Sequence, residues 1–274
     1  MISSRDQAAA LFNGVLMIQH GPRAWLPIGL MLSIALLVNA SFLSGAQAGA
    51  LSISPVRITL APGTTSGLMT VRNESPDPVR LQLSLHTWLE SPDGAMQLAP
   101  TEDLVVFPGL LQLKPNESRK VRIGLPAQQD ITVEKTYRVF LEELPGSSKP
   151  DQNQVRVLAR IGVPIFLQPR EPKPGWTAAV SHPDDKGFRL QLKNTGNVHL
   201  ILQEVTLRGI GLKDQAIFDQ TLRGGYLLAD SIRTHTINVP LADRAKLTAC
   251  RIHLVTPDGP RDETVACPPG LQKQ

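Results

Sequence analysis

Two cysteines are the residues of this sequence most able to do chemistry. Cys250 and Cys267 are the only cysteines among 274 residues, and an even count predicts one disulfide if the chain is exported. The alternative is a thiolate nucleophile, which needs a base, and His253 is the only local candidate. On a strand the odd offset puts Cys250 and His253 on opposite faces. The spacing therefore favours the disulfide.

Motifs for catalysis are absent from the sequence. It holds no Gly-x-Ser-x-Gly, Walker or Gly-x-Gly-x-x-Gly pattern, and its histidines lack metal-ligand spacing. A net charge of +4 and 4% aromatic residues show no basic stripe with stacking rings. We therefore expect no enzyme, cofactor, metal, small-molecule substrate or nucleic-acid partner. A hydrolase without a recognisable motif is the opposing interpretation.

The N-terminal segment has the layout of a secretory signal peptide. Arg23 precedes the apolar run Trp25 to Leu37, and Ala46-Gln47-Ala48 and Ala48-Gly49-Ala50 offer small-x-small cleavage sites. The run is shorter than the roughly 20 residues that a membrane span needs. We predict that residues 1–50 are removed on export; a retained N-terminal anchor is the alternative.

The elements that must position any functional residue are short strands. The 23 prolines and 21 glycines leave little room for long helices. Leu51 to Leu60 alternates as one half-buried strand, and further strands follow at turn signals up to residue 169. Short strand pieces surround Pro108. This rhythm favours a β-sandwich.

The longest alternating segment runs from Val155 to Leu167. Its even positions include Arg160, Gly162 and Pro164. Such a strand is longer than usual, so it either spans two domains or presents an edge. An ordinary core strand is the other interpretation. The apolar residues that share one face are Val155, Val157, Ala159, Ile161, Val163, Ile165 and Leu167.

A Pro-rich stretch divides the chain after this strand. Gln168 to Gly175 reads QPREPKPG, and the short-strand rhythm resumes at Trp176. We predict an all-β protein with a first domain over residues 51–169 and a second over residues 170–274.

Five segments, in order, resemble the PapD-like periplasmic chaperones of the chaperone–usher pathway. Arg57 lies in the first of them, and the last, which ends at Gln168-Pro169, resembles the strand called G1 in that family. The segments are SISPVRITLAPG, VRNESPDPVRLQLSLHTWLE, FPGLLQLKPNESRKVRIGL, EKTYRVFLEELP and the alternating strand itself.

The resemblance implies two immunoglobulin-like sandwiches in a boomerang arrangement and a periplasmic chaperone. Such a chaperone binds pilus or fimbrial subunits by donor-strand complementation and delivers them to an outer-membrane usher. The resemblance assigns subunit binding to Val155, Val157, Ala159, Ile161 and Val163.

It also implies two basic residues that anchor the subunit's terminal carboxylate. Arg57 matches the first by position, and a guanidinium fits a carboxylate in bidentate fashion. The second basic residue has no match in this sequence, because Gly162 or Pro164 stands where the family has lysine. Arg138 and Arg160 are the candidates to replace it.

A structural or adhesive component of a surface fibre is the alternative function. Such a subunit would carry an N-terminal donor extension and one incomplete sandwich, whereas the predicted mature chain enters its first strand at once.

Overall fold

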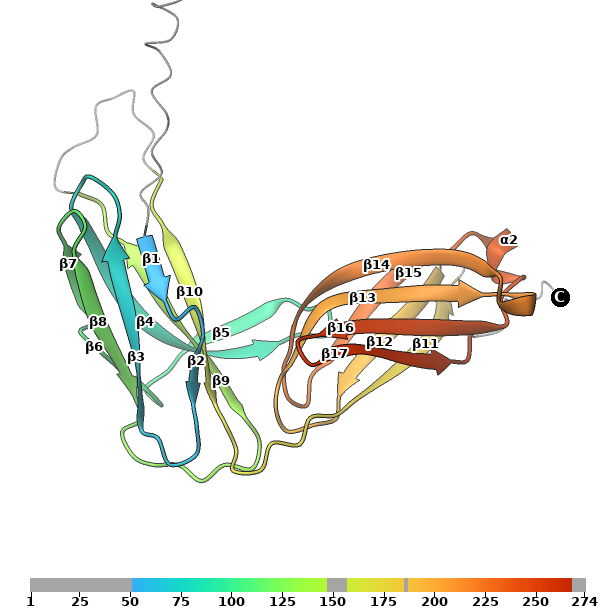
Figure 1. Ribbon diagram of the computed structural model, residues 1–274, viewed down its shortest axis with the longest axis horizontal. Coiled ribbons are helices and arrows are strands. Elements are labelled where there is room, and N and C mark those ends of the chain that lie inside the picture. The colour runs from blue at the N-terminus through green and yellow to red at the C-terminus, as the bar shows by residue number, and fades with distance from the viewer. Residues whose placement is uncertain (1–50, 147–156, 185–186, 268–274) are drawn as a thin grey trace, which may run out of the picture. The chain divides into compact units, whose positions relative to one another are not determined.

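A computed structural model describes residues 51–146, 157–184 and 187–267 (Figure 1). Residues 1–50, which include the predicted signal peptide, and Val155 lie outside these ranges. Almost every described element is a strand, as the sequence predicts. The two helical elements are single turns, η1 (Leu212–Asp214) and α2 (Leu241–Arg244).

The strands up to Leu167 form two sheets around one core. In the first sheet the order is β1-β3-β8-β6, and in the second it is β2-β10-β9-β4-β5, with β7 also paired to β4. Their bounds are β1 Leu51–Ser54, β2 Ile58–Leu60, β3 Ser66–Asn73, β4 Val79–Glu90, β5 Met96–Pro100, β6 Val105–Phe107, β7 Leu110–Leu113, β8 Ser118–Gly124, β9 Lys135–Glu143 and β10 Arg160–Leu167.

The strands from Trp176 onward form two further sheets around a second core. One has the order β11-β12-β15 and the other β14-β13-β16-β17. The two cores share no residue, so the sequence builds two separate sandwiches. The bounds are β11 Trp176–Asp184, β12 Gly187–Asn194, β13 Leu200–Ile210, β14 Ala216–Leu227, β15 Ile232–Asn238, β16 Ala249–Thr256 and β17 Gly259–Val265.

The predicted single strand from Leu51 to Leu60 is wrong. The chain leaves one sheet after Ser54 and enters the other at Ile58, with a cis Ser54–Pro55 bond between the two parts. Pro55 has no N–H to donate to a ladder, which suits it to this break. Val56, which lies in the break between the two parts, is exposed.

Each sandwich uses a buried asparagine to close the turn after an inner strand. The Asn73 side-chain amide donates to the carbonyls of Leu113 and Asp77, and its Oδ1 accepts from Ser75. Asn194, equally buried, donates to the carbonyl of Leu227 in the second sandwich. Because the side-chain amides of both asparagines find hydrogen-bond partners inside the protein, they fix the turns without leaving unpaired buried atoms.

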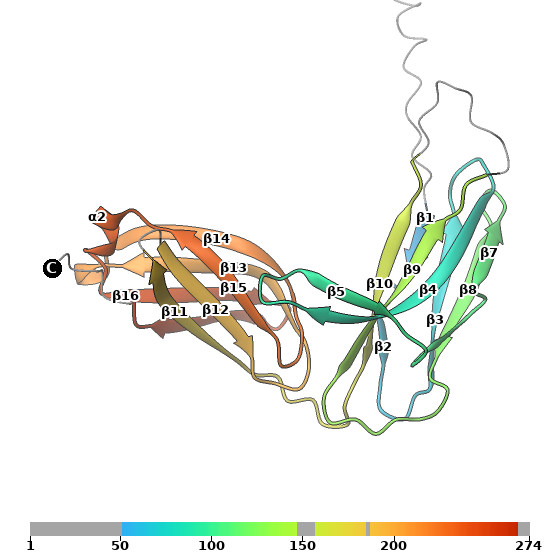
Figure 2. The same ribbon diagram turned by 180° about the vertical axis from the view of Figure 1, so that it is seen from behind.

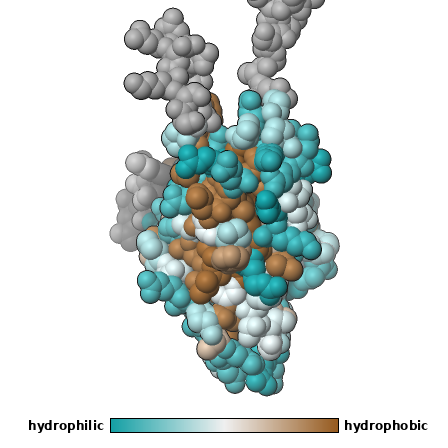
Figure 3. Space-filling model, turned by 90° about the vertical axis from the view of Figure 1, so that its left-hand side faces the viewer, coloured by the Kyte–Doolittle hydropathy of each residue, from teal (hydrophilic) through white to brown (hydrophobic). Residues whose placement is uncertain are grey.

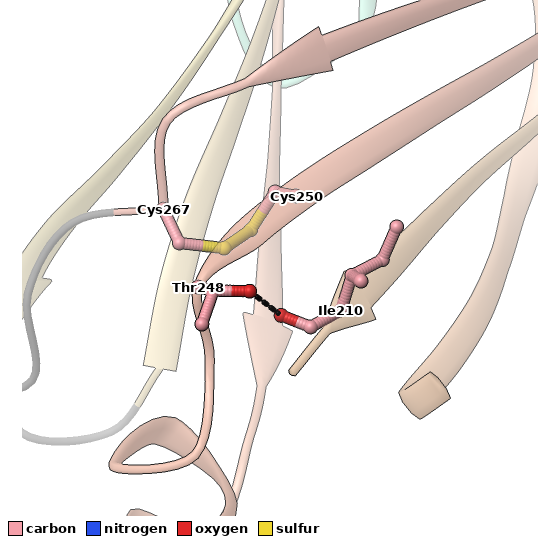
Figure 4. The surroundings of a disulfide bond; sticks show 4 residues. All are labelled: Ile210, Thr248, Cys250 and Cys267. Carbon is pink, nitrogen blue, oxygen red and sulfur yellow. Dashed lines mark hydrogen bonds between the residues drawn. A yellow bond between two sulfur atoms is a disulfide. The ribbon is translucent and has the colours of Figure 1, made fainter. Parts of the chain in front are cut away.

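The predicted disulfide between Cys250 and Cys267 is present. It joins the start of β16 to the chain just after β17, with the two Cα atoms 5.2 Å apart (Figure 4). Thr248, next to it, donates its hydroxyl to the carbonyl of Ile210 over 3.0 Å. The bond therefore closes the last hairpin of the second sandwich, and Cys250 carries no free thiol for catalysis.

Candidate functional site

Strand β10 has one edge that is only partly paired. It pairs with β9 along its whole length, from Arg160↔Glu142 to Leu167↔Lys135. On its other side β2 runs parallel to it and pairs only with Ile165–Leu167. Figures 1 and 2 show β2 beside one end of β10 alone. Within the described ranges, no strand therefore covers this edge from Arg160 to Pro164.

The hydrogen-bond pattern shows which main-chain groups face that edge. The N–H of Glu143 donates to the carbonyl of Ala159 over 2.8 Å, which makes them a hydrogen-bonded pair. In an antiparallel ladder such pairs alternate, so odd-numbered residues of β10 point their N–H and C=O groups at β9. The even-numbered Arg160 and Gly162 point theirs at the free edge. The N–H of Gln168, also even, donates to Leu60 on β2.

The apolar face of this segment passes gradually from surface to core. Val157 is 85% exposed, whereas Ala159 and Ile161 are half-buried. Val163 is only 2% exposed and packs in the core of the first sandwich. The expectation that Val163 contacts a partner is therefore not compatible with this conformation, because its side chain already has apolar neighbours of its own.

The predicted strand from Val155 is also shorter than expected. Strand β10 begins at Arg160, and Val157 to Ala159 have no strand conformation. The physical reason is the neighbouring strand: β9 ends at Glu143, which pairs with Ala159, so Val157 and Leu158 have no strand to pair with. Alternation in the sequence cannot reveal where the neighbouring strand stops.

Arg160, one of the predicted anchors, lies on the outer face of this sheet and already has partners. Its guanidinium contacts the Glu142 carboxylate over 2.6 Å and lies 4.3 Å from the centre of the Phe140 ring. The side chain is still 56% exposed. A ligand carboxylate would have to compete with Glu142 for it.

Arg138 has a different environment. Its guanidinium lies 4.1 Å above the ring of Trp88, and its Nε is buried without a hydrogen-bond partner among the described residues. Burial lowers the pKa of this guanidinium from its ordinary value. An unpaired, partly desolvated cation of this kind is suited to receive an anion.

Arg57 lies on the other side of β10 from Arg138. It is exposed and directly precedes Ile58, which pairs with Ile165. Pro164 pairs with Arg138 on the opposite side of β10. Because neighbouring strands are about 4.8 Å apart, the backbones of Arg57 and Arg138 flank Pro164 at roughly 10 Å from each other. The structure thus places two of the three predicted arginines on opposite sides of β10, near Pro164.

Trp88 and Glu142 are residues of this face that sequence reasoning did not single out. Trp88 is buried and supports Arg138, and Glu142 occupies Arg160. The register of β4, β9 and β10 brings these residues together, and the sequence gives no direct signal for that register.

A second exposed apolar surface lies on other strands of the first sandwich. Val105 and Phe107 of β6 and Leu110 of β7 are exposed. Figure 3 shows apolar surface flanked by hydrophilic residues on the side where β6, β7 and β8 lie. These strands stand away from β10 in the sheet order, so contact at one surface leaves the other accessible.

The described ranges contain neither a cluster of metal-ligating side chains nor a membrane-spanning helix. No group of three or more His, Cys, Asp or Glu residues in them could hold a metal ion. None of the helices found there has the length and apolar character to cross a membrane.

The sequence of the first sandwich matches a known protein family. Residues 50–173 match the family model of the pili and flagellar-assembly chaperone, PapD N-terminal domain. A comparison with curated proteins gives no match.

Solved structures resemble the chain over both sandwiches. A chain of the CsuC–CsuE chaperone–tip adhesion subunit pre-assembly complex, from archaic chaperone–usher Csu pili of Acinetobacter baumannii, matches with a TM-score of 0.58 and 17% identity. The match covers 79% of this chain and 97% of that one.

Two further structures match similarly. A chain of the Salmonella enterica SafA pilin–SafB chaperone complex gives a TM-score of 0.53 and 15% identity, over 80% of this chain and 98% of that one. The class 5 fimbriae chaperone CfaA gives 0.54 and 16%, over 80% and 100%. This chain therefore carries a PapD N-terminal domain over residues 50–173 and has the two-sandwich fold of the PapD-like chaperones.

Proposed function

We propose that this chain is a periplasmic chaperone that binds pilus or fimbrial subunits by lending them the free edge of β10. The observation that carries the proposal is the edge of β10 from Arg160 to Pro164, which no strand of the described ranges covers and which Arg57 and Arg138 flank on its two sides. An unprotected edge is normally avoided because it pairs with other chains. Here such pairing would be the function, in the manner of β-strand addition.

Apolar side chains would supply most of the affinity for a subunit. Val157, Ala159 and Ile161 are exposed or half-buried and share one face of the segment. Burying a Val or Ile side chain contributes about 1.5–3 kcal/mol. The main-chain ladder would add hydrogen bonds and direct these side chains into successive pockets of a subunit that lacks one strand.

The two arginines would receive the terminal carboxylate of the subunit. Arg57 and Arg138 flank Pro164, and neither has an ion-pair partner among the described residues. Arg138 is the better second anchor because Arg160 is occupied by Glu142. A guanidinium can bind a carboxylate through two parallel hydrogen bonds, which fixes orientation as well as position.

The similar structures support subunits as the partner class. The CsuC–CsuE structure is a complex of a chaperone with a tip adhesion subunit, and the SafA–SafB structure is one of a pilin with a chaperone. We further propose export to the periplasm, domains over residues 51–169 and 170–274, and delivery to an outer-membrane usher. Delivery would need a second surface, and the exposed residues of β6 and β7 provide one.

Replacing Ile161 tests the proposal. Ile161→Asp would bury an unpaired charge between chaperone and subunit, which costs several kcal/mol. We expect the variant to lose a tagged subunit encoded near its gene when the two are co-expressed and purified from the periplasm. Circular dichroism checks that the variant itself is folded.

Ile232→Asp provides the matched control. Ile232 is a strand residue of the second sandwich that is 37% exposed, so the same substitution there should leave subunit recovery unchanged. Full recovery of the subunit with folded Ile161→Asp would show that β10 does not lend its edge.

A further inference from the structure

The longest edge strand of the second sandwich is β14, which pairs with another strand on one side only. It has 12 residues and stands at the end of the sheet order β14-β13-β16-β17. Near its C-terminal end, Arg233 of β15 donates to the carbonyls of Gly224 and Tyr226. Among the described residues, no strand pairs with the other side of β14 between residues 216 and 223.

This edge lacks the features that protect other edges of the same sandwich. Strand β11 contains Pro183 and a register shift, β17 contains Pro260, and β15 has only 7 residues. Proline, irregular pairing and short length all discourage an edge from pairing with another chain. Strand β14 contains no proline, and its register shift lies at its start, opposite Gly209 and Ile210. The edge from Phe218 onward can therefore accept a further strand.

The exposed side chains of β14 form a sequence that is complementary to itself. Asp219, Thr221 and Arg223 are exposed, whereas Phe218 and Leu222 pack against the core of the second sandwich. Two antiparallel copies of the strand that cross at Thr221 would place Asp219 of each copy opposite Arg223 of the other. The two threonines would then lie opposite each other. Opposite charges and threonine pairs are both favourable neighbours across an antiparallel ladder.

Both charged side chains are available for such a contact. Arg223 has no ion-pair partner among the described residues, although Glu204 lies opposite it in the ladder with β13. Asp219 accepts from Arg208 through Oδ2 alone, at 2.5 and 2.9 Å, and its side chain is 44% exposed. The Oδ1 atom of Asp219 can therefore accept from a second guanidinium, because a carboxylate has several acceptor sites.

We propose that β14 pairs with β14 of a second copy of this chain, in an antiparallel ladder whose two-fold axis passes through Thr221. Only this register forms both ion pairs, and a shift by two residues loses them. A shift by four places either Asp219 or Arg223 opposite its own copy, which is repulsive. An odd shift brings the charged side chains of one copy to the apolar face of the other.

The resulting dimer would join two four-stranded sheets into one continuous sheet. A single short ladder buries less surface than a standard interface, so we expect a weak dimer that forms in the micromolar range or above. The inference goes beyond the proposed function and does not depend on it. Strand β10 belongs to a different sheet in the first sandwich, so its edge takes no part in this contact.

The test measures the oligomeric state of the complete mature chain by sedimentation velocity between about 1 and 500 μM. Asp219→Arg leaves two basic side chains on the edge, and Arg223→Asp leaves two acidic ones. Each variant alone should dimerise at least about tenfold more weakly than the wild-type chain, because both contacts become repulsive. An equimolar mixture of the two variants should associate as the wild-type chain does, since the mixed dimer restores both ion pairs.

Arg251→Asp is the matched control for the change of charge. Arg251 is exposed on the same sheet, but it lies on β16, which has a strand on either side. This variant should dimerise as the wild-type chain does. Ile161→Asp, on β10, should also leave the dimer intact. Circular dichroism and thermal unfolding verify that each variant is folded.

A wild-type chain that stays monomeric over the whole concentration range would overturn the inference. So would a mixture of Asp219→Arg and Arg223→Asp that associates no better than either variant alone. A dimer that is lost in Ile161→Asp but kept in Arg223→Asp would form through β10 and would equally overturn it. Binding of a subunit by β10 is measured separately, so each of these outcomes leaves the proposed function intact.

Discussion

The three predicted anchor arginines of the first sandwich differ in what surrounds them. Arg160 is paired with Glu142, Arg138 is half-buried above Trp88, and Arg57 is exposed just before β2. A carboxylate gains most from cations that are not already neutralised. The three residues are of one type, so it is their surroundings that decide how well each arginine could bind a carboxylate.

Alanine substitutions at these positions should separate their roles. Arg57→Ala and Arg138→Ala should each weaken binding of a subunit peptide by about 10- to 150-fold, the loss of a hydrogen bond to a charged group of about 1.5–3 kcal/mol. Arg160→Ala should change the affinity for the subunit peptide by less than about threefold. Titration calorimetry with the C-terminal peptide measures these changes.

The amidated peptide is the control for this experiment. It lacks the carboxylate, so Arg57→Ala and Arg138→Ala should affect its binding little. If Arg160→Ala has the largest effect on the free-acid peptide, the second anchor is Arg160 and the ion pair with Glu142 opens on binding.

His235 of the second sandwich should make stability depend on pH. Burial, reinforced by the positive charge of Arg233, lowers the pKa of its imidazole below 6.5. Just below pH 6.5 the unfolded chain therefore binds a proton that the folded chain does not. The free energy of unfolding must fall as the pH falls through this range.

His235→Asn should flatten that dependence between about pH 5 and pH 7. Urea unfolding of the wild-type chain and the variant at several pH values measures it. An equal slope in both proteins would show that His235 does not carry the effect.

At the scale of elements, the sequence predicts the strands well and their partners poorly. The alternation of Val155 to Leu167 predicts a strand, because side chains on a strand alternate between faces, and the structure has one from Arg160 to Leu167. It places Val157 and Val163 in equivalent positions, yet one is exposed and the other lies in the core. The difference arises because Val163 lies within β10, which pairs with β9 along its whole length, whereas Val157 precedes β10.

The positions of the predicted anchor arginines also depend on strand pairing, which the sequence does not reveal. Arg57 and Arg138 are 81 positions apart in sequence, and only the register of three strands brings them to either side of Pro164. The preference for Arg138 over Arg160 depends on Glu142 and Trp88, which the sequence alone does not connect with either arginine.

The contribution of the disulfide to the stability of the second sandwich can be tested independently of peptide binding. It closes the hairpin of β16 and β17, and the two cysteines are 17 positions apart in sequence. On the chain-entropy model, a loop of this size stabilises the folded state by about 3 kcal/mol. Reduction, or the Cys250→Ala/Cys267→Ala double variant, should lower the unfolding free energy of the second sandwich by about that amount.

Urea unfolding with and without reductant measures this loss, with peptide binding by β10 as the control. The binding edge belongs to the first sandwich, so it should remain functional when the disulfide is open. A second sandwich that unfolds at the same urea concentration in both conditions would contradict the prediction.

At the scale of the whole molecule, the two sandwiches share a structural feature but differ in how they compare with known proteins. Each is closed by a buried asparagine at the end of an inner strand, Asn73 in one and Asn194 in the other. The first also matches a family model, whereas the second resembles known proteins in fold. The partly paired edge of β10 and the arginines beside it lie in the first sandwich, so we propose that the subunit is recognised there.

The compartment is the last property of the whole chain that the sequence predicts. An apolar run from Trp25 to Leu37 and small-x-small sites at Ala48 and Ala50 precede the first strand, which begins at Leu51. A disulfide also requires an oxidising compartment to form and persist. We therefore expect cleavage near Ala48 or Ala50, with a mature chain starting near Gly49 or Leu51. N-terminal sequencing of the protein from a periplasmic extract measures this directly. A soluble cytoplasmic protein that keeps Met1 or Met17 as its first residue would contradict it, and the donor-strand role would then lack the compartment in which pilus subunits are assembled.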